Sequence, residues 1–173
     1  MTALTYAGIG ARATPAATLR DMTVIAGWLA RKGWHLASGG ADGADSSFAG
    51  GAPAGMRTIY IPWRDYNGHR GADCHVLSGA SLTRCSDVAA AHHPDWSRCS
   101  STVRRLHARN AAILLGPSLD RPVSAAICWT PLGRVTGGTG MSIRIAEAYD
   151  IPVFNLATMH PRAVCERMLQ LRG

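Results

Sequence analysis

Lysine is nearly missing from this chain, in which Lys32 is the only lysine among 18 basic side chains. Arginine therefore carries almost all of the formal net charge of +7. Its planar guanidinium suits bidentate contacts with phosphate groups. Such a basic balance is compatible with a nucleotide or nucleic-acid partner, and a general bias against lysine would produce the same composition.

Membrane-spanning and secretory sequences are also missing. No apolar run approaches the roughly 20 residues that a membrane span requires. Residues 1–5 lack the basic-then-apolar pattern of a secretion signal. We therefore expect a cytoplasmic protein with no membrane partner.

Paired cysteines are a third absence. The five cysteines are odd in number and form no CxxC pair, which argues against a disulfide framework. The cysteines and histidines between residues 74 and 99 are spaced more loosely than in typical zinc sites. No metal and no other cofactor is therefore expected.

Short apolar segments alternate with segments of helical period along most of the chain. Strands are predicted at residues 4–7, 34–37, 57–63, 123–129 and 151–155, with helices at residues 15–32, 42–49, 81–92, 101–115, 141–149 and 161–171. This alternation predicts an α/β fold with a doubly wound, mostly parallel sheet and helices on both faces. We expect one domain over residues 1–173, with an irregular helical insertion around residues 64–100.

Two glycine clusters lie between predicted strands and helices. Residues 38–45 (SGGADGAD) follow one strand, and residues 136–140 (TGGTG) directly precede a helix. Glycines leave room for backbone N–H groups to close around an anion, and the following helix directs its positive dipole end to the same place. The two clusters together predict that a phosphate-bearing ligand is held at the carboxyl edge of the sheet.

The candidate ligand-binding residues belong to the turns after the strands, to the two glycine clusters and to the helix 101–115. They are Gly8, Gly10, Arg12, Ser38, Gly39, Gly40, Asp42, Asp45, Trp63, His107, Arg109, Asn110, Thr130, Gly137, Gly138, Thr139, Gly140 and Ser142. Structural alternatives remain open for them. The glycines can be turn residues, Asp42 and Asp45 can stabilise a helix N-terminus, Arg109 can lie on a solvated basic face, and Trp63 can pack in the core.

Four motifs occur in an order that resembles the SLOG superfamily of Rossmann-like proteins: GIGAR at 8–12, SGGADGAD at 38–45, LHARN at 106–110 and TGGTG at 136–140. The resemblance spans residues 4–155. The superfamily includes the DNA-processing protein DprA (Smf), LOG phosphoribohydrolases, molybdenum-cofactor carriers and nucleotide-sensing antiphage domains. The chain is most similar to small DprA-like proteins, many of them phage-encoded. The resemblance implies a Rossmann-like fold and a homo-oligomer.

One position departs from the LOG pattern. LOG enzymes carry a catalytic glutamate after the second glycine motif, where this chain has Arg144. Glu147 lies three residues further on, and with Arg109 it would be the catalytic pair if the chain were a hydrolase. A guanidinium at the glutamate position would repel an oxocarbenium-like centre, so binding without strong catalysis is favoured.

Three functions follow as hypotheses. The first is binding of a nucleotide or an ADP-ribose-like signal between the glycine clusters, as in a phage-type sequestering or sensing protein. The second is DprA-like binding of single-stranded DNA in recombination. The third is LOG-like hydrolysis of nucleoside monophosphates through Glu147.

Overall fold

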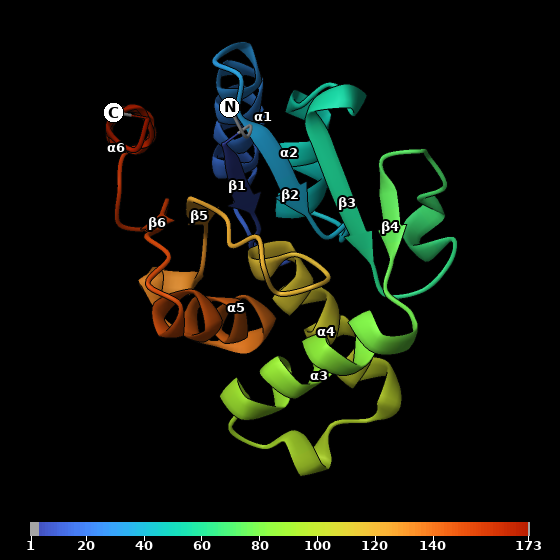
Figure 1. The fold of residues 1–173 in the computed structure, drawn as a ribbon. Helices are drawn as coiled ribbons and strands as arrows, with labels where there is room; N and C mark the ends of the chain where they lie inside the picture. The colour runs from blue at the N-terminus through green and yellow to red at the C-terminus, as the bar shows by residue number, and fades with distance from the viewer. Residues whose placement is uncertain (1–3, 173) are drawn as a thin grey trace.

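The computed structural model describes residues 4–172, and over that range it contains a six-stranded sheet in which every neighbouring pair is parallel. The strand order is β4-β3-β2-β1-β5-β6, which places β1 between β2 and β5 (Figure 1). The strands are β1 (Thr5–Gly8), β2 (His35–Ser38), β3 (Arg57–Ile61), β4 (Cys74–Val76), β5 (Ala125–Cys128) and β6 (Val153–Asn155).

Helices cover both faces of the sheet. One layer is formed by α1 (Ala16–Arg31), α2 (Ala44–Gly51) and α6 (Pro161–Gln170), and the other by α3 (Gly79–His92), α4 (Ser101–Leu115) and α5 (Gly137–Ala148). Figure 1 shows α3, α4 and α5 gathered below the sheet. The predicted α/β, doubly wound Rossmann-like architecture is confirmed.

The strands alternate their side chains between two hydrophobic clusters. Tyr6 and Ile127 pack under α1, α2 and α6, whereas Ala7 and Cys128 pack under α3, α4 and α5. All four are at most 1% exposed. Because both faces are buried, the strands are apolar throughout, as expected for a parallel sheet between two helical layers.

Local signals set both boundaries of α4 but not the start of α1. Ser100 is the N-cap of α4, where its hydroxyl accepts a hydrogen bond from the Val103 N–H at 3.3 Å, and Gly116 ends the helix with a φ of 76°. Thr14, which precedes α1, does not cap this helix. The Thr14 hydroxyl donates instead to the Ala11 carbonyl at 2.5 Å, and Pro15 occupies the N-cap position without a side-chain hydrogen bond.

The segment 64–100 contains a strand that the sequence did not predict. It holds β4, α3 and two short 3-10 turns, Tyr66–Gly68 and Trp96–Arg98. An ion pair of 2.5 Å between Arg57 Nε and Asp73 Oδ2 fixes the start of β4 to the start of β3. Within residues 4–172, no helix has the length and apolar character needed to cross a membrane.

Candidate functional site

A cavity of about 450 Å³ opens where the chain connections leave β1 and β5. This is the point at which the strand order changes direction, and parallel sheets of this type form their ligand crevices there. Ten of the predicted residues line the cavity, from four parts of the chain: Gly10 and Arg12 after β1, Asp45 on α2, His107, Arg109 and Asn110 on α4, and Gly137, Gly138, Thr139 and Ser142 on α5.

The second glycine cluster forms the first turn of α5. The sequence predicted a loop that precedes a helix at Met141, but the helix begins at Gly137. The Gly140 N–H donates to the Thr136 carbonyl at 2.9 Å, which closes the first helical turn. A helix leaves the N–H groups of its first turn without helical acceptors. Those of residues 137–139 therefore lie at the cavity with the positive end of the helix dipole.

Arg109 is a buried cation in the wall of the cavity, with only 5% of its surface exposed. One of its nitrogens, Nη1, donates to the Gly39 carbonyl and lies 4.0 Å from Asp45 Oδ2. Its guanidinium also lies 5.7 Å from the centre of the Tyr66 ring. No partner among the described residues accepts a hydrogen bond from Nη2, so this donor is available to a ligand.

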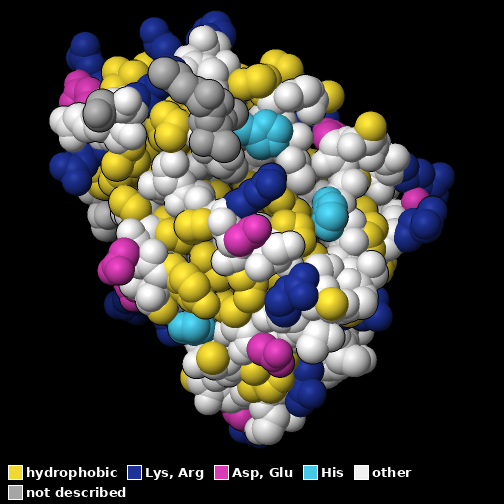
Figure 2. Space-filling model, viewed as in Figure 1, with side chains coloured by type: hydrophobic (Ala, Val, Ile, Leu, Met, Phe, Trp, Pro, Cys, Tyr) yellow, Lys and Arg dark blue, Asp and Glu magenta, His cyan; other side chains and the backbone are white. Residues whose placement is uncertain are grey.

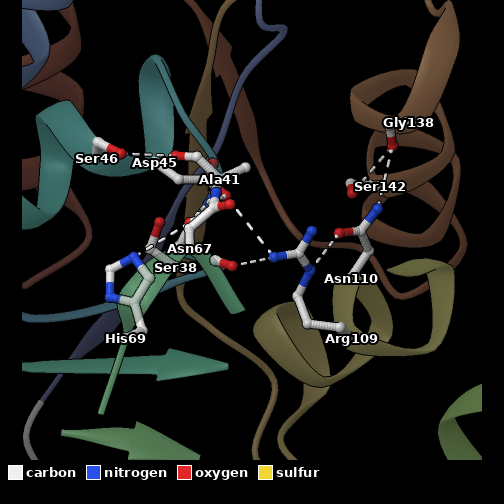
Figure 3. A network of polar contacts seen from close by, with 12 residues as sticks. Ser38, Ala41, Asp45, Ser46, Asn67, His69, Arg109, Asn110, Gly138 and Ser142 are labelled. Atoms are coloured by element: carbon white, nitrogen blue, oxygen red, sulfur yellow. Dashed lines mark hydrogen bonds and ion pairs between the residues drawn. The ribbon is translucent and has the colours of Figure 1, made fainter. Parts of the chain in front are cut away.

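Asn110 connects this cation to the second glycine cluster. Its side-chain oxygen accepts from Arg109 Nε at 3.1 Å, and its amide nitrogen donates to the Gly138 carbonyl at 3.4 Å. Ser142 Oγ donates to the same carbonyl at 3.4 Å. Figure 3 shows the resulting chain of contacts, which runs from α2 through Arg109 and Asn110 to the start of α5.

Asp45 holds the first glycine cluster in shape. Its Oδ2 accepts from the Ala41 N–H at 3.2 Å, and burial raises the pKa of this carboxyl although Arg109 opposes the shift. His107 lies nearby on α4, where burial, with smaller contributions from His93, Arg109 and Arg144, lowers its pKa to about 4. His107 is therefore neutral at pH 7.

Tyr66 is a cavity residue that sequence reasoning missed. It is 8% exposed and lines the cavity beside Arg109. Asp65 and Asn67 on either side have φ values of 63° and 49°, and this left-handed geometry folds the segment back toward the first glycine cluster. The Asn67 amide and the His69 ring each lie 3.1 Å from the Gly40 carbonyl. An aromatic residue between Asp and Asn in a turn-like segment was the only available signal.

Comparison with solved structures gives one informative neighbour. The fold resembles that of DNA processing protein A. The similar structure is that of DNA processing protein A from Helicobacter pylori, which was described for its single-stranded DNA binding mode. The TM-score of the two structures is 0.51, and their sequence identity is 19%. The similarity covers 89% of this chain and 65% of that structure. No protein-family model and no curated protein matches the sequence.

Eight predicted ligand-binding residues do not line the cavity. Three of these lie at or just after the ends of β1, β2 and β5, and a fourth, Gly140, lies in α5. A Cβ on Gly8 would lie 2.6 Å from the Phe48 ring, so this glycine is required by core packing. Ser38 donates its hydroxyl to the Gly8 carbonyl at 2.7 Å. Thr130 is fully buried and accepts from the Asn155 amide at 2.7 Å. A Cβ on Gly140 would lie 2.6 Å from the Val135 carbonyl carbon, which explains the glycine there.

The other four belong to the first glycine cluster and its surroundings. Gly39 and Gly40 position their carbonyls for Arg109 and for the turn at 66–69. Asp42 is exposed beside the cavity-lining Ala41. Trp63 packs edge-on against Tyr66 with a distance of 5.3 Å between ring centres. It supports an aromatic cavity wall without lining the cavity.

Arg144 and Glu147, on which the hydrolase hypothesis depends, also lie outside the cavity. Arg144 Nε donates to the His92 carbonyl at 3.1 Å, so its guanidinium joins α5 to the end of α3. Arg144 does not line the cavity, although the glycine motif led us to expect its guanidinium there. Glu147 is exposed on α5. Among the described residues that line the cavity, Asp45 is the only acidic one.

Proposed function

We propose that this chain binds the phosphate of a nucleotide in the cavity at the carboxyl ends of β1 and β5. The observation that supports the proposal is a convergence of donors. The first turn of α5 and the Arg109 guanidinium border the same cavity and are joined through Asn110. A helix N-terminus and a partly unpaired arginine are the two groups that proteins most often direct at phosphate oxygens.

The size and lining of the cavity favour a small nucleotide. Its volume of about 450 Å³ falls within the range of roughly 300–1,000 Å³ typical of small-molecule sites. Ile9, Leu106 and Tyr66 supply apolar and aromatic surface for a base, and the exposed Arg12 lies at the cavity with its charge free to meet a second phosphate.

We further propose that the nucleotide is held without cleavage. Hydrolysis of an N-glycosidic bond needs a carboxylate beside the sugar. Asp45 already accepts the Ala41 N–H and lies beside Arg109, and Glu147 lies away from the cavity. A protein of this kind would sequester or sense a nucleotide, including an ADP-ribose-like signal, as a dimer or higher oligomer.

The test is isothermal titration calorimetry against nucleoside monophosphates, cyclic nucleotides and ADP-ribose derivatives. We expect saturable binding to at least one of them. Arg12→Ala should weaken that binding by about tenfold, the loss of one charge-assisted hydrogen bond. The matched control is Arg20→Ala, which removes an exposed arginine from α1 and should change nothing. Absence of binding by every compound at high micromolar concentration would refute the proposal.

Single-stranded DNA is a second candidate, favoured by the net charge of +7 and by the similarity to DNA processing protein A. On the face shown in Figure 2, however, the Lys and Arg side chains are spread over the surface and do not form one continuous basic track. A DNA complex should weaken steeply with salt. A gel shift that is absent at low salt would remove this candidate and leave the mononucleotide proposal intact.

A further inference from the structure

A group of three potential metal ligands lies beside the cavity, at the junction of α3 and α4. His93 follows the end of α3, Cys99 follows the short turn Trp96–Arg98, and His107 lies on α4. Each offers one ligand atom, and the three atoms lie within 4.8 Å of one another. Cys99 lies six positions after His93 and His107 eight positions after Cys99, a spacing that does not indicate a metal site in the sequence. The three side chains come together only when α4 is folded.

One distance in this group matches the geometry of a tetrahedral zinc ion. Cys99 Sγ lies 3.6 Å from His93 Nε2, and the His93 and His107 rings are 4.7 Å apart between centres. A Zn–N bond of about 2.0 Å and a Zn–S bond of about 2.3 Å at a tetrahedral angle separate the two ligand atoms by roughly 3.6 Å. The sulfur and this nitrogen are therefore already at the separation that a shared zinc ion imposes.

His107 supplies a second, independent observation. It is 9% exposed, and its Nδ1 is buried without a hydrogen-bond partner among the described residues. A buried imidazole nitrogen that lacks a partner is costly, and proteins normally satisfy it with a hydrogen bond or a metal ion. Packing alone does not explain why this nitrogen is buried without a partner. It also does not explain why a thiol and a second imidazole lie close to the same ring.

We propose that His93, Cys99 and His107 form a zinc-binding site with an open fourth position. Two imidazoles and one thiolate are a donor set that Zn²⁺ prefers, and three protein ligands leave one position for water or for an oxygen of a bound molecule. His107 also lines the cavity, so the metal ion would lie at the cavity wall.

Binding changes the protonation and the contacts of the ligands. Cys99 releases its thiol proton to solvent, and the thiolate partly offsets the charge of the metal. His93 Nδ1 accepts from the Asp95 N–H at 3.1 Å in the structure. An imidazole that binds zinc through Nε2 carries its proton on Nδ1, so this contact is lost and the turn at 95–98 is expected to shift.

The test uses the tag-free full chain, stripped with a chelator and reloaded with zinc. We expect one zinc ion per chain by mass spectrometry of the metal content. We also expect Co²⁺ loading to produce the near-ultraviolet sulfur-to-cobalt charge-transfer band of a thiolate ligand. Cys99→Ser should abolish that band and weaken zinc binding by at least about 100-fold. His93→Gln should weaken zinc binding similarly.

The matched controls are Cys74→Ser and Cys165→Ser, which change half-buried cysteines outside the group. Both should keep the cobalt band and the zinc stoichiometry. A second measurement, thermal unfolding with and without zinc, shows whether each variant is folded. Zinc should raise the melting temperature of the parent chain and of the controls, but not that of Cys99→Ser. No zinc binding by the parent chain, or unchanged binding by Cys99→Ser, would overturn the proposal and leave a hydrogen-bonded Cys99–His93 pair.

Discussion

Gly138 offers a perturbation that separates ligand binding from folding. It lies in the first turn of α5, its carbonyl accepts from Asn110, and a Cβ built on it has no atom within 4 Å. The Cβ of Gly138→Val therefore meets no other part of the protein, and the stability should change by less than about 0.5 kcal/mol, the difference in helix propensity. The added side chain would occupy the space through which a phosphate approaches the free N–H groups.

The expected loss of affinity follows from the contact that is blocked. One charge-assisted hydrogen bond contributes about 1.5–3 kcal/mol, so Gly138→Val should weaken nucleotide binding by about 10- to 150-fold in calorimetry. Gly50→Val is the matched control because Gly50 is also helical, also has no atom within 4 Å of a built Cβ, and does not line the cavity. If Gly138→Val binds as tightly as Gly50→Val, the first turn of α5 is not the phosphate site.

Two further substitutions test the packing and the ion pair described above. Gly8→Ala should destabilise the protein by about 1–3 kcal/mol in chemical denaturation, because its Cβ would lie 2.6 Å from the Phe48 ring; unchanged stability would contradict the packing role of Gly8. Burial acts to raise the pKa of Asp73, but the hydrogen bond and charge of Arg57, together with smaller hydrogen-bond contributions, outweigh burial and lower this pKa. The ion pair therefore stabilises the fold above pH 4, and this stabilisation is lost as the pH falls through the lowered value. Asp73→Asn should therefore be less stable than the parent chain at pH 7, and the difference should shrink below pH 4; a difference that is constant with pH would argue against the pair.

The fold was predictable because the signals that define it are local. The helical period of α1, the serine cap of α4 and the apolar strands each act within a few residues, and their alternation specifies the layers. The three residues of β4 are too short to show a period, and the contact that fixes this strand joins Arg57 to Asp73 across 16 positions. That pairing exists only in the folded protein.

The candidate site was predictable in its backbone and less so in its side chains. The start of the second glycine cluster and Arg109 carry recognisable patterns, so their place at the cavity could be anticipated, whereas the glycines of the first cluster do not line it. Ser38 and Thr130 are polar residues at strand ends, and the sequence does not show that each turns inward to a backbone or amide partner. Tyr66 reaches the cavity through a left-handed turn, a conformation that non-glycine residues rarely adopt.

The link formed by Arg109 and Asn110 makes the cavity depend on the rotational phase of one helix. These adjacent residues on α4 reach in different directions, to the Gly39 carbonyl and to the Gly138 carbonyl. One residue inserted between Ser101 and Leu106 would rotate both side chains by about 100° relative to the start of α4 and its cap. Either the Ser100 cap or the contacts of Arg109 and Asn110 would be lost, while the strand order of the sheet would not change. Changes in the length of this helix should therefore be tolerated far less than changes in the exposed turns around the cavity.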